Sequence, residues 1–220
     1  MNIEFLGQSC FLIKAGPHSL LTDPFLTGNP LAAKKPEEVH PTHILVSHAH
    51  NDHLGDTKAI AKANGAKVYS TFDICQSLQA EGISFEGGNI GGKIPADFGS
   101  VKLVPAIHSS GVPGGIACGF VINIAGKNIY FAGDTALFGD MALLAKENID
   151  IALLPIGDYF TMGPEDAAEA VRLIKPKHVI PMHYNTFPPI TQDPQQFKKL
   201  VESKTDAKVT ILDPGDGASF

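Results

Sequence analysis

The sequence predicts an α/β fold built as a four-layer αββα sandwich, in which two mixed β-sheets pack face to face and helices cover the outside. Three observations support this prediction. Each half of the 220-residue chain begins with short apolar runs and then alternates strands with helices. Hydrophobic residues make up 44% of the chain, enough to bury a substantial core. No linker or low-complexity segment interrupts residues 1–220, so we expect a single domain.

The first half opens with three strand candidates. The runs IEFLG, CFLIKAG and SLLTD are short and apolar, and glycine or the GPH turn separates them. The loop LTDPFLTGNP leads to HILVS, which predicts a buried strand. Residues 56–64 predict a helix, residues 66–70 a strand, and residues 72–82 a second helix that ends at Gly82. The glycine-rich stretch 85–100 predicts hairpin turns, because no P-loop lysine pattern follows it.

The second half repeats this order. Strands are predicted at VKLVPAIH, CGFVINI and NIYFAG, followed by a helix at about residues 136–147 and the buried strand DIALLPI. The segment GPEDAAEAVRLIKP predicts a helix with Pro164 near its start and Pro176 at its end. HVIPM predicts a strand, Asp193 is placed to cap a last helix, and KVTILD predicts a final strand.

Charge and cysteine content argue against several classes of protein. A net charge of −6 lacks the basic stripe of a nucleic-acid binder, so no nucleic-acid partner is expected. No apolar run approaches the ~20 residues that span a bilayer, so no membrane partner is expected. The N-terminal MNIEFLGQSCFLIK lacks the basic start and long apolar core of a signal peptide. Cys10, Cys75 and Cys118 form no CxxC pattern, which favours buried thiols in a reducing cytoplasm.

The segment SHAHNDHLGD places three histidines and an aspartate between a buried strand and a helix. Residues two apart in an extended segment point to the same side, so His48 and His50 can reach one point together. Asp52 and His53 then project from the start of the helix toward a neighbouring point. Imidazole and carboxylate groups suit zinc and similar divalent ions, so one loop can contribute to two adjacent metal positions. The alternative is a polar turn that happens to be rich in histidine.

Further candidate ligands follow other predicted strands. His108 ends VKLVPAIH, Asp134 follows NIYFAG, and His183 follows HVIPM. In layered α/β folds the ends of strands are where sites collect. Each residue alone has a structural explanation, a hydrogen-bonded histidine or, for Asp134, a helix N-cap. Together with SHAHNDHLGD they favour metal ligation. Four other histidines have no partners at ligand spacing and are expected to be structural or exposed: His18, His40, His43 and His178.

This ordered set, H-x-H-x-D-H, a lone histidine, an aspartate after FAG and a final histidine, resembles the metallo-β-lactamase superfamily. The motifs GQSCFLI, TDPFLTGNP, HSSG, AGDTALFGDM and LLPIGDYFTMGPEDA resemble a branch of metal-dependent hydrolases related to the L-ascorbate-6-phosphate lactonases. The resemblance covers essentially the whole chain. It implies the four-layer αββα fold, which agrees with the order of elements above.

The resemblance also implies how two metal ions would be held. The first ion would bind His48, His50 and His108. The second would bind Asp52, His53 and His183, and Asp134 would bridge both. Asp23 of LTDP matches an early aspartate of the superfamily that orients a liganding group, with a turn-forming aspartate before proline as the alternative. Gln8 stands where relatives often have histidine, so no role is assigned to it.

The predicted activity is hydrolysis of a small ester, a phosphodiester or a lactone, by a hydroxide that bridges two divalent ions. Asp52 is the predicted catalytic residue, because its carboxylate can orient the water or carry its proton. Histidine-rich ligation favours Zn²⁺, and Mn²⁺, Fe²⁺ or Ni²⁺ tolerate the same donors. The alternative is a metal-binding sensor or scaffold without turnover. The resemblance also allows a homo-oligomer.

Polar residues beside the predicted ligands are candidates for contact with a small-molecule substrate. They occur in the segments HSSG, GDYFTMG and HYNT, each next to a strand end. Loop packing explains each of them at least as well as substrate contact does. The candidates are Ser109, Tyr159, Thr161, Tyr184 and Asn185.

Overall fold

The computed structural model describes all 220 residues. The strands of the first sheet are β1 (Asn2–Gly7), β2 (Cys10–Ala15), β3 (His18–Thr22), β4 (His43–Leu45), β5 (Lys67–Thr71), β6 (Phe85–Gly88) and β14 (Gly217–Ser219). Those of the second sheet are β7 (Lys93–Ala96), β8 (Gly99–Pro105), β9 (Cys118–Ile124), β10 (Lys127–Phe131), β11 (Ile151–Pro155), β12 (His178–Met182) and β13 (Lys208–Val209). The α-helices are α1 (Asn51–Leu54), α2 (Thr57–Asn64), α3 (Phe72–Gln79), α4 (Pro164–Ile174) and α5 (Pro194–Lys204). Short 3₁₀ segments are η1 (Pro36–Glu38), η2 (Gly139–Glu147) and η3 (Pro188–Ile190).

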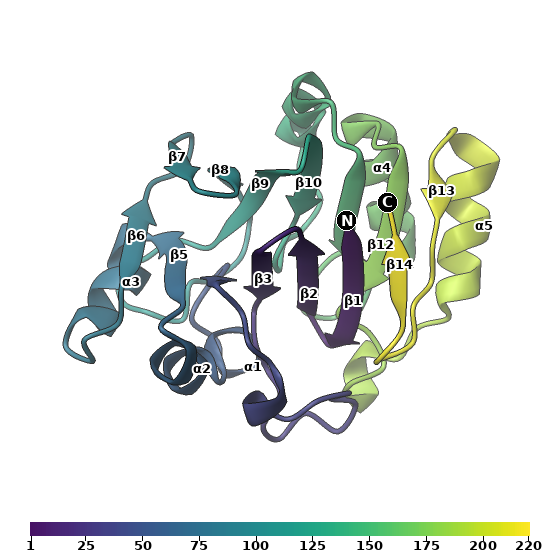
Figure 1. Cartoon of the computed structure of the whole chain (residues 1–220). Coiled ribbons are helices and arrows are strands. Elements are labelled where there is room, and N and C mark those ends of the chain that lie inside the picture. The colour runs from purple at the N-terminus through teal and green to yellow at the C-terminus, as the bar shows by residue number, and fades with distance from the viewer.

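Both sheets are mixed, and they have the same internal plan (Figure 1). The strand orders are β14-β1-β2-β3-β4-β5-β6 and β13-β12-β11-β10-β9-β8-β7. In each sheet three antiparallel pairings on one side give way to three parallel pairings on the other. The N- and C-termini lie side by side, because β14 pairs with β1.

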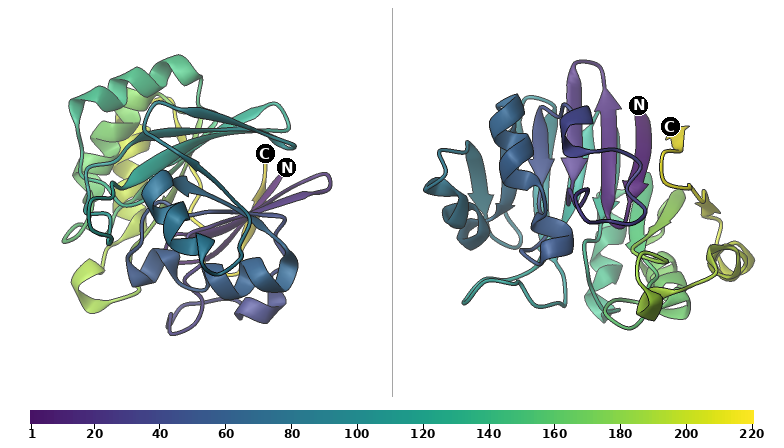
Figure 2. Two further views of the ribbon diagram at one scale, coloured as in Figure 1. Left: turned by 90° about the vertical axis from the view of Figure 1, so that its left-hand side faces the viewer. Right: turned by 90° about the horizontal axis from the view of Figure 1, so that it is seen from below.

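Helices cover the outer face of each sheet (Figure 2). On the first sheet α2 packs on β4 and α3 packs on β5 and β6. On the second sheet α4 packs on β11, α5 on β13, and η2 on α4. The buried residues Ala167, Ala170, Val171 and Ile174 of α4 follow the spacing of one helix face. The predicted four-layer αββα class is therefore confirmed. None of these helices has the length and apolar character that crossing a bilayer requires.

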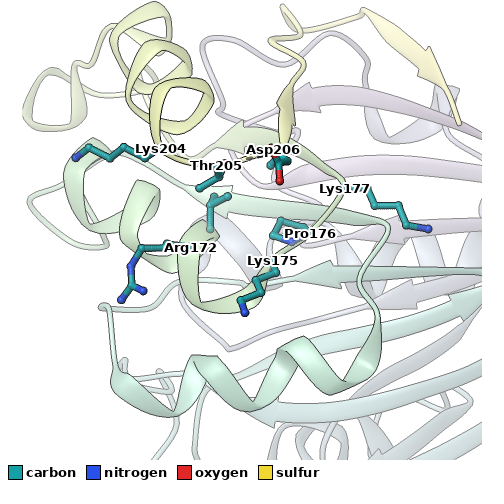
Figure 3. A pocket seen from close by; sticks show the side chains of 9 residues that line it. Arg172, Lys175, Pro176, Lys177, Lys204, Thr205 and Asp206 are labelled. Atoms are coloured by element: carbon teal, nitrogen blue, oxygen red, sulfur yellow. Dashed lines mark hydrogen bonds between the residues drawn. The ribbon is translucent and has the colours of Figure 1, made fainter.

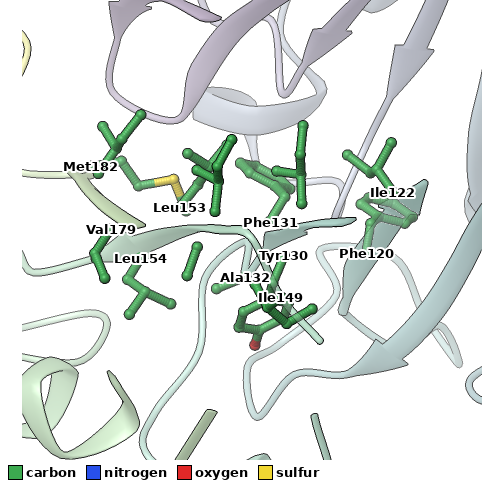
Figure 4. Packing of buried hydrophobic residues seen from close by; sticks show 14 of the residues in the cluster. Phe120, Ile122, Tyr130, Phe131, Ala132, Ile149, Leu153, Leu154, Val179 and Met182 are labelled. Atoms are coloured by element: carbon green, nitrogen blue, oxygen red, sulfur yellow. The ribbon is translucent and has the colours of Figure 1, made fainter. Parts of the chain in front are cut away.

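The alternation of side chains along a strand divides the core. In β2, Phe11 and Ile13 belong to a large apolar cluster that fills the space between the sheets and continues under α4 and α5, whereas Cys10 and Leu12 belong to the cluster under α2 and α3. Alternate residues of a strand face opposite sides of its sheet, so a strand buried on both sides is apolar throughout. Figure 4 shows part of the large cluster, with buried side chains on both faces of the second sheet around Phe131.

Several elements differ from the sequence prediction. The stretch 85–100, predicted to hold hairpin turns, contains the β7–β8 hairpin but also β6, a parallel neighbour of β5 in the first sheet. The helix predicted at about 136–147 is the 3₁₀ segment η2, and its buried Met141 and Leu144 are three residues apart, which matches a 3₁₀ turn. The strand predicted at KVTILD is limited to β13, because the chain then leaves the second sheet through a turn at Pro214 and Gly215. It next forms β14 in the first sheet, a strand that the sequence did not indicate.

Candidate metal centre

The ends of five strands bring all seven predicted ligands, and Asp23, to one edge of the sandwich. Asp23 follows β3, and the segment that starts at His48 follows β4. His108, Asp134 and His183 lie after the C-terminal ends of β8, β10 and β12. Parallel strands point their carboxyl ends the same way, so residues far apart in the sequence meet there.

We use the term first triad for His48, His50 and His108. His48 Nε2 lies 3.0 Å from His50 Nδ1, and His108 Nε2 lies 3.3 Å from the same atom. His48 is fully buried, whereas His50 and His108 are partly exposed. The three nitrogens therefore face one common point that remains open to solvent.

Hydrogen bonds that link His48 to Ser47, and Ser47 to Asp23, orient the His48 ring. The Ser47 hydroxyl donates to Asp23 Oδ2 across 2.6 Å, so its oxygen is left to accept from His48 Nδ1, 2.9 Å away. With the proton on Nδ1, the lone pair of His48 Nε2 points toward the other two histidines. Burial lowers the pKa of His48 to about 2, so the ring is neutral at physiological pH. This is the form that binds a metal ion.

We use the term second triad for Asp52, His53 and His183. Asp52 Oδ2 lies 3.4 Å from His53 Nε2 and 3.6 Å from His183 Nε2. The two histidine rings stack, with centroids 5.5 Å apart. His53 and His183 are buried, while Asp52 is partly exposed at the rim. This arrangement joins two histidines and a carboxylate within ligand range of one ion.

Asp134 lies between the two triads. Its Oδ2 atom is 3.2 Å from His53 Nε2 and 3.1 Å from His183 Nε2 in the second triad. The same oxygen is 4.0 Å from His48 Nε2 and 3.7 Å from His108 Nε2 in the first triad. One buried carboxylate oxygen therefore faces imidazole nitrogens from both sides.

Several of these atoms are buried without a hydrogen-bond partner, namely His53 Nε2, Asp134 Oδ1 and both ring nitrogens of His183. Burial favours neutral Asp134, but His183 and His53 outweigh it and hold its pKa well below the usual range. Burial lowers the pKa of His183, yet the Asp134 and Asp52 carboxylates outweigh it and raise that pKa to about 9. The carboxylates of Asp134 and Asp52 thus favour positive charge beside them. Because unsatisfied buried polar atoms are costly, this donor set fits divalent metal ions.

Asp23 stands behind both triads, as the resemblance implied for a residue that orients a ligand. Its Oδ2 accepts a hydrogen bond from His53 Nδ1 at 2.7 Å, and its Oδ1 accepts one from the Ser47 N–H at 2.7 Å. Histidine ligands usually donate their second N–H to such a partner, which fixes the ring. Ser47 was not singled out from the sequence, because a serine at the end of a strand carries no distinctive pattern.

Gln8 also contacts the site. Its side-chain amide donates to Asp52 Oδ2 across 2.9 Å. Gln8, Asp23 and His183 all adopt positive φ angles, of 55°, 33° and 55°. Such angles are uncommon for residues other than glycine, and they cluster at functional sites where the surroundings impose them.

A cavity of about 610 Å³ opens over the two triads. Its base contains ligand candidates from both triads together with Asp134. Its walls include Phe25, Phe160, Phe187 and Pro189, and no lysine or arginine lines it. These apolar walls could not be predicted from local sequence patterns, because they come from three loops that meet only in the folded chain.

The predicted substrate residues occupy different places. Ser109 lines the cavity, and its Oγ lies 3.2 Å from His50 Nε2. Tyr159 is 74% exposed and packs edge-on against Phe160, and Thr161 accompanies it on the same loop. Tyr184 packs against the large apolar cluster. Asn185 uses its side-chain oxygen to accept the Gln192 N–H at 2.8 Å. The cavity wall therefore contains Ser109 and none of the other four.

A second hollow of about 560 Å³ lies away from the triads, at the C-terminal end of α4 (Figure 3). Its basic rim includes Arg172 and Lys177, which already pair with Glu169 and Asp150. No histidine and no cysteine lines it. This hollow therefore lacks the imidazole ligands that the triads offer.

A family model described as the beta-lactamase superfamily domain matches residues 2–183. The chain belongs to the metallo-β-lactamase superfamily. Within this superfamily it is similar to a UPF0173 metal-dependent hydrolase from Symbiobacterium thermophilum, with 52% identity over 220 residues and 98% of each chain covered. A UPF0173 metal-dependent hydrolase from Thermococcus kodakarensis is 51% identical over 225 residues, again with 98% of each chain covered.

Solved structures of the superfamily agree with the fold. Igni18, a metallo hydrolase from Ignicoccus hospitalis, superposes with a TM-score of 0.94 at 38% identity, covering 100% of this chain and 97% of Igni18. An isothiocyanate hydrolase from Delia radicum gut bacteria has a TM-score of 0.80 at 17% identity, covering 100% and 99% of the two chains. The second likeness extends to the superfamily fold alone.

Proposed function

We propose that this chain is a hydrolase that holds two divalent metal ions and cleaves a small ester. The observation that carries the proposal is the position of Asp134 Oδ2, within 4.0 Å of imidazole nitrogens from both triads. The first ion would be held by His48, His50 and His108, and the second by Asp52, His53 and His183, with Asp134 shared. The relatives are metal-dependent hydrolases by name and about half identical to this chain, which supports the reaction class.

Two such ions, when bound, would lower the pKa of a shared water toward 7 and polarise the bond to be cleaved. The residues of the chain would supply position and proton transfer. Asp52 lies in the cavity wall with Oδ2 held by the Gln8 amide, which leaves Oδ1 to orient a water or accept its proton. Phe25, Phe160 and Phe187 would exclude bulk water from the bond under attack.

The residues of the cavity wall favour an ester substrate whose groups on either side of the cleaved bond are apolar and uncharged. Three phenylalanines and Pro189 present apolar surface beside the triads, and no cationic side chain is present to pair with a remote phosphate. Burying an unpaired anion there would be costly. A phosphodiester with apolar substituents or an unphosphorylated lactone therefore fits better than a phosphorylated sugar lactone. Zinc suits the histidine-rich donors best.

A metal-binding sensor or scaffold without turnover is the competing function. A structural zinc site would close around its ion with four protein ligands. Here the first triad offers three nitrogens beneath a cavity large enough for a small molecule. The open side favours a site that receives a substrate.

Hydrolysis assays with a matched variant test this proposal. Bis-p-nitrophenyl phosphate and γ-phenyl-γ-butyrolactone would be given to the wild type, to Asp52→Asn, and to Asp73→Asn as an exposed control on α3. We expect turnover by the wild type and control, and a loss of kcat/KM of about 100-fold or more in Asp52→Asn. A wild type that binds two ions and cleaves no ester would instead support the sensor or scaffold.

A further inference from the structure

His18, His43 and Asp97 meet at the opposite edge of the sandwich from the triads. His18 and His43 are the first residues of the parallel strands β3 and β4, whereas the triads follow the strand ends. Asp97 comes from the second sheet, in the turn between β7 and β8. His18 and His43 were expected to be structural or exposed, because neither has a partner at ligand spacing along the chain. Strand pairing and sheet packing nevertheless bring the three residues together.

Three potential ligand atoms converge there. His43 Nε2 lies 3.0 Å from Asp97 Oδ1, and His18 Nδ1 lies 3.9 Å from the same oxygen. All three atoms lie within 4.8 Å of one another. Ligand bonds of about 2.0–2.2 Å place neighbouring ligand atoms on a common ion roughly 3–4 Å apart. The spacing therefore matches three donors around one ion.

The hydrogen bonds of His43 direct its free lone pair at Asp97. The Thr42 hydroxyl donates to the Ser19 carbonyl oxygen at 3.0 Å, so its oxygen accepts from His43 Nδ1, 2.8 Å away. Nε2 of the neutral ring is then an acceptor, and it faces another acceptor, the Asp97 carboxylate. Two acceptors at 3.0 Å repel unless a cation lies between them.

The surroundings keep His43 in place. Its ring packs on Phe98 and Tyr69, at centroid distances of 4.8 and 5.8 Å. Lys67, which pairs with His43 in the strand register, forms an ion pair with Glu86 at 3.3 Å. A metal ion would relieve the contact between His43 Nε2 and Asp97 Oδ1.

We propose that His18, His43 and Asp97 form a separate site for one divalent transition-metal ion, such as Zn²⁺, Ni²⁺ or Cu²⁺. Two imidazoles and one carboxylate suit these ions, whereas Mg²⁺ and Ca²⁺ prefer oxygen ligands alone. Asp97 is 67% exposed, so water can complete the coordination. The bound ion would tie β3 and β4 of the first sheet to the β7–β8 turn of the second, and would stabilise the fold.

Zinc binding to four forms of the full chain tests this site. The wild type, His18→Gln, Asp97→Asn and the control His178→Gln would be dialysed against the same free Zn²⁺, and the bound metal counted by mass spectrometry. His178 is a matched control, because it also begins a parallel strand and has no carboxylate partner. The melting temperature would be measured with and without added Zn²⁺, and circular dichroism would check the fold.

We expect the wild type and His178→Gln to bind one more Zn²⁺ than the other two variants, whose affinity for that ion falls at least about tenfold. Zinc should raise the melting temperatures of the wild type and His178→Gln more than that of Asp97→Asn. Hydrolysis of esters should be equal in all four forms, since none of these residues lines the cavity. Equal zinc counts and affinities in the wild type, His18→Gln and Asp97→Asn would overturn the proposal, whatever the fate of the proposed hydrolase function.

Discussion

His53 donates its Nδ1–H to Asp23 Oδ2 across 2.7 Å, although 30 residues separate the two in the chain. Both side chains are fully buried. The bond fixes the tautomer of His53 and turns Nε2 toward Asp52 and Asp134. The same carboxylate holds Ser47, which in turn accepts from His48. Asp23 therefore positions one histidine in each triad without lying beside the proposed ions itself.

Asp23→Asn should weaken metal binding by about 10- to 100-fold, because an amide accepts less strongly from His53 and brings donors of its own. Competition with a zinc-binding dye would measure this affinity, with the buried Asp150→Asn as control at the far edge. A variant that folds normally and keeps wild-type zinc affinity would show that Asp23 only shapes the turn before Pro24.

Gly55→Ala should be strongly destabilising. Gly55 has φ +36°, and a Cβ atom there would lie 2.3 Å from the Pro24 carbonyl oxygen. We expect a loss of unfolding free energy larger than the about 1–3 kcal/mol that backbone strain alone costs. Gly65→Ala is the matched control, since Gly65 has φ +63° but open space around it. Urea unfolding of both variants measures the difference, and equal losses would disprove the steric argument.

Phe187→Ala should reduce the preference for apolar esters. Phe187 forms part of the cavity wall and its ring lies 6.3 Å from that of Phe25. We expect kcat/KM for γ-phenyl-γ-butyrolactone to fall about tenfold or more, with a much smaller change for unsubstituted γ-butyrolactone. Phe72→Ala, an exposed phenylalanine on α3, is the control. Equal effects on both lactones would mean that the wall does not contact the substituent.

Asp150 should make stability depend on pH. Burial would raise its pKa, but hydrogen bonds from Lys177 and the Asn128 N–H outweigh burial and lower it. A carboxylate with a depressed pKa stabilises the folded state above its unfolded pKa of about 3.9, and this stabilisation is lost as the pH falls through the lower folded value.

Asp150→Asn should therefore be less stable than the wild type at pH 7, by about 1 kcal/mol, and the gap should close below about pH 4. Denaturant unfolding at several pH values measures the gap, with exposed Asp206→Asn as the reference for general acid effects. A gap that stays constant with pH would exclude this role for Asp150.

The fold and the ligand candidates could be predicted because their signals are local. His48 and His50 are two residues apart, and His108, Asp134 and His183 each follow an apolar run that could be recognised as a strand. The continuous apolar run of β2 and the Pro164 start of α4 are equally local. Periodicity and strand ends thus carry most of the architecture and the place of the site.

Other features depend on contacts that no local pattern encodes. Phe25, Phe160 and Phe187 share a wall only because three loops meet, and β14 exists only because β1 offers an open edge. The positive φ angle of Gln8 is imposed by the folded surroundings, since glutamine does not favour it. The meeting of His18 and His43 with Asp97 likewise requires both sheets.

Anomalous X-ray diffraction from crystals of the zinc-loaded protein tests the central claim most directly. We predict two strong zinc peaks at the triads, one on the side of His48, His50 and His108 and one on the side of Asp52, His53 and His183, with Asp134 between them. A single peak, or zinc bound only away from Asp134 in fully loaded crystals, would contradict the two-ion centre.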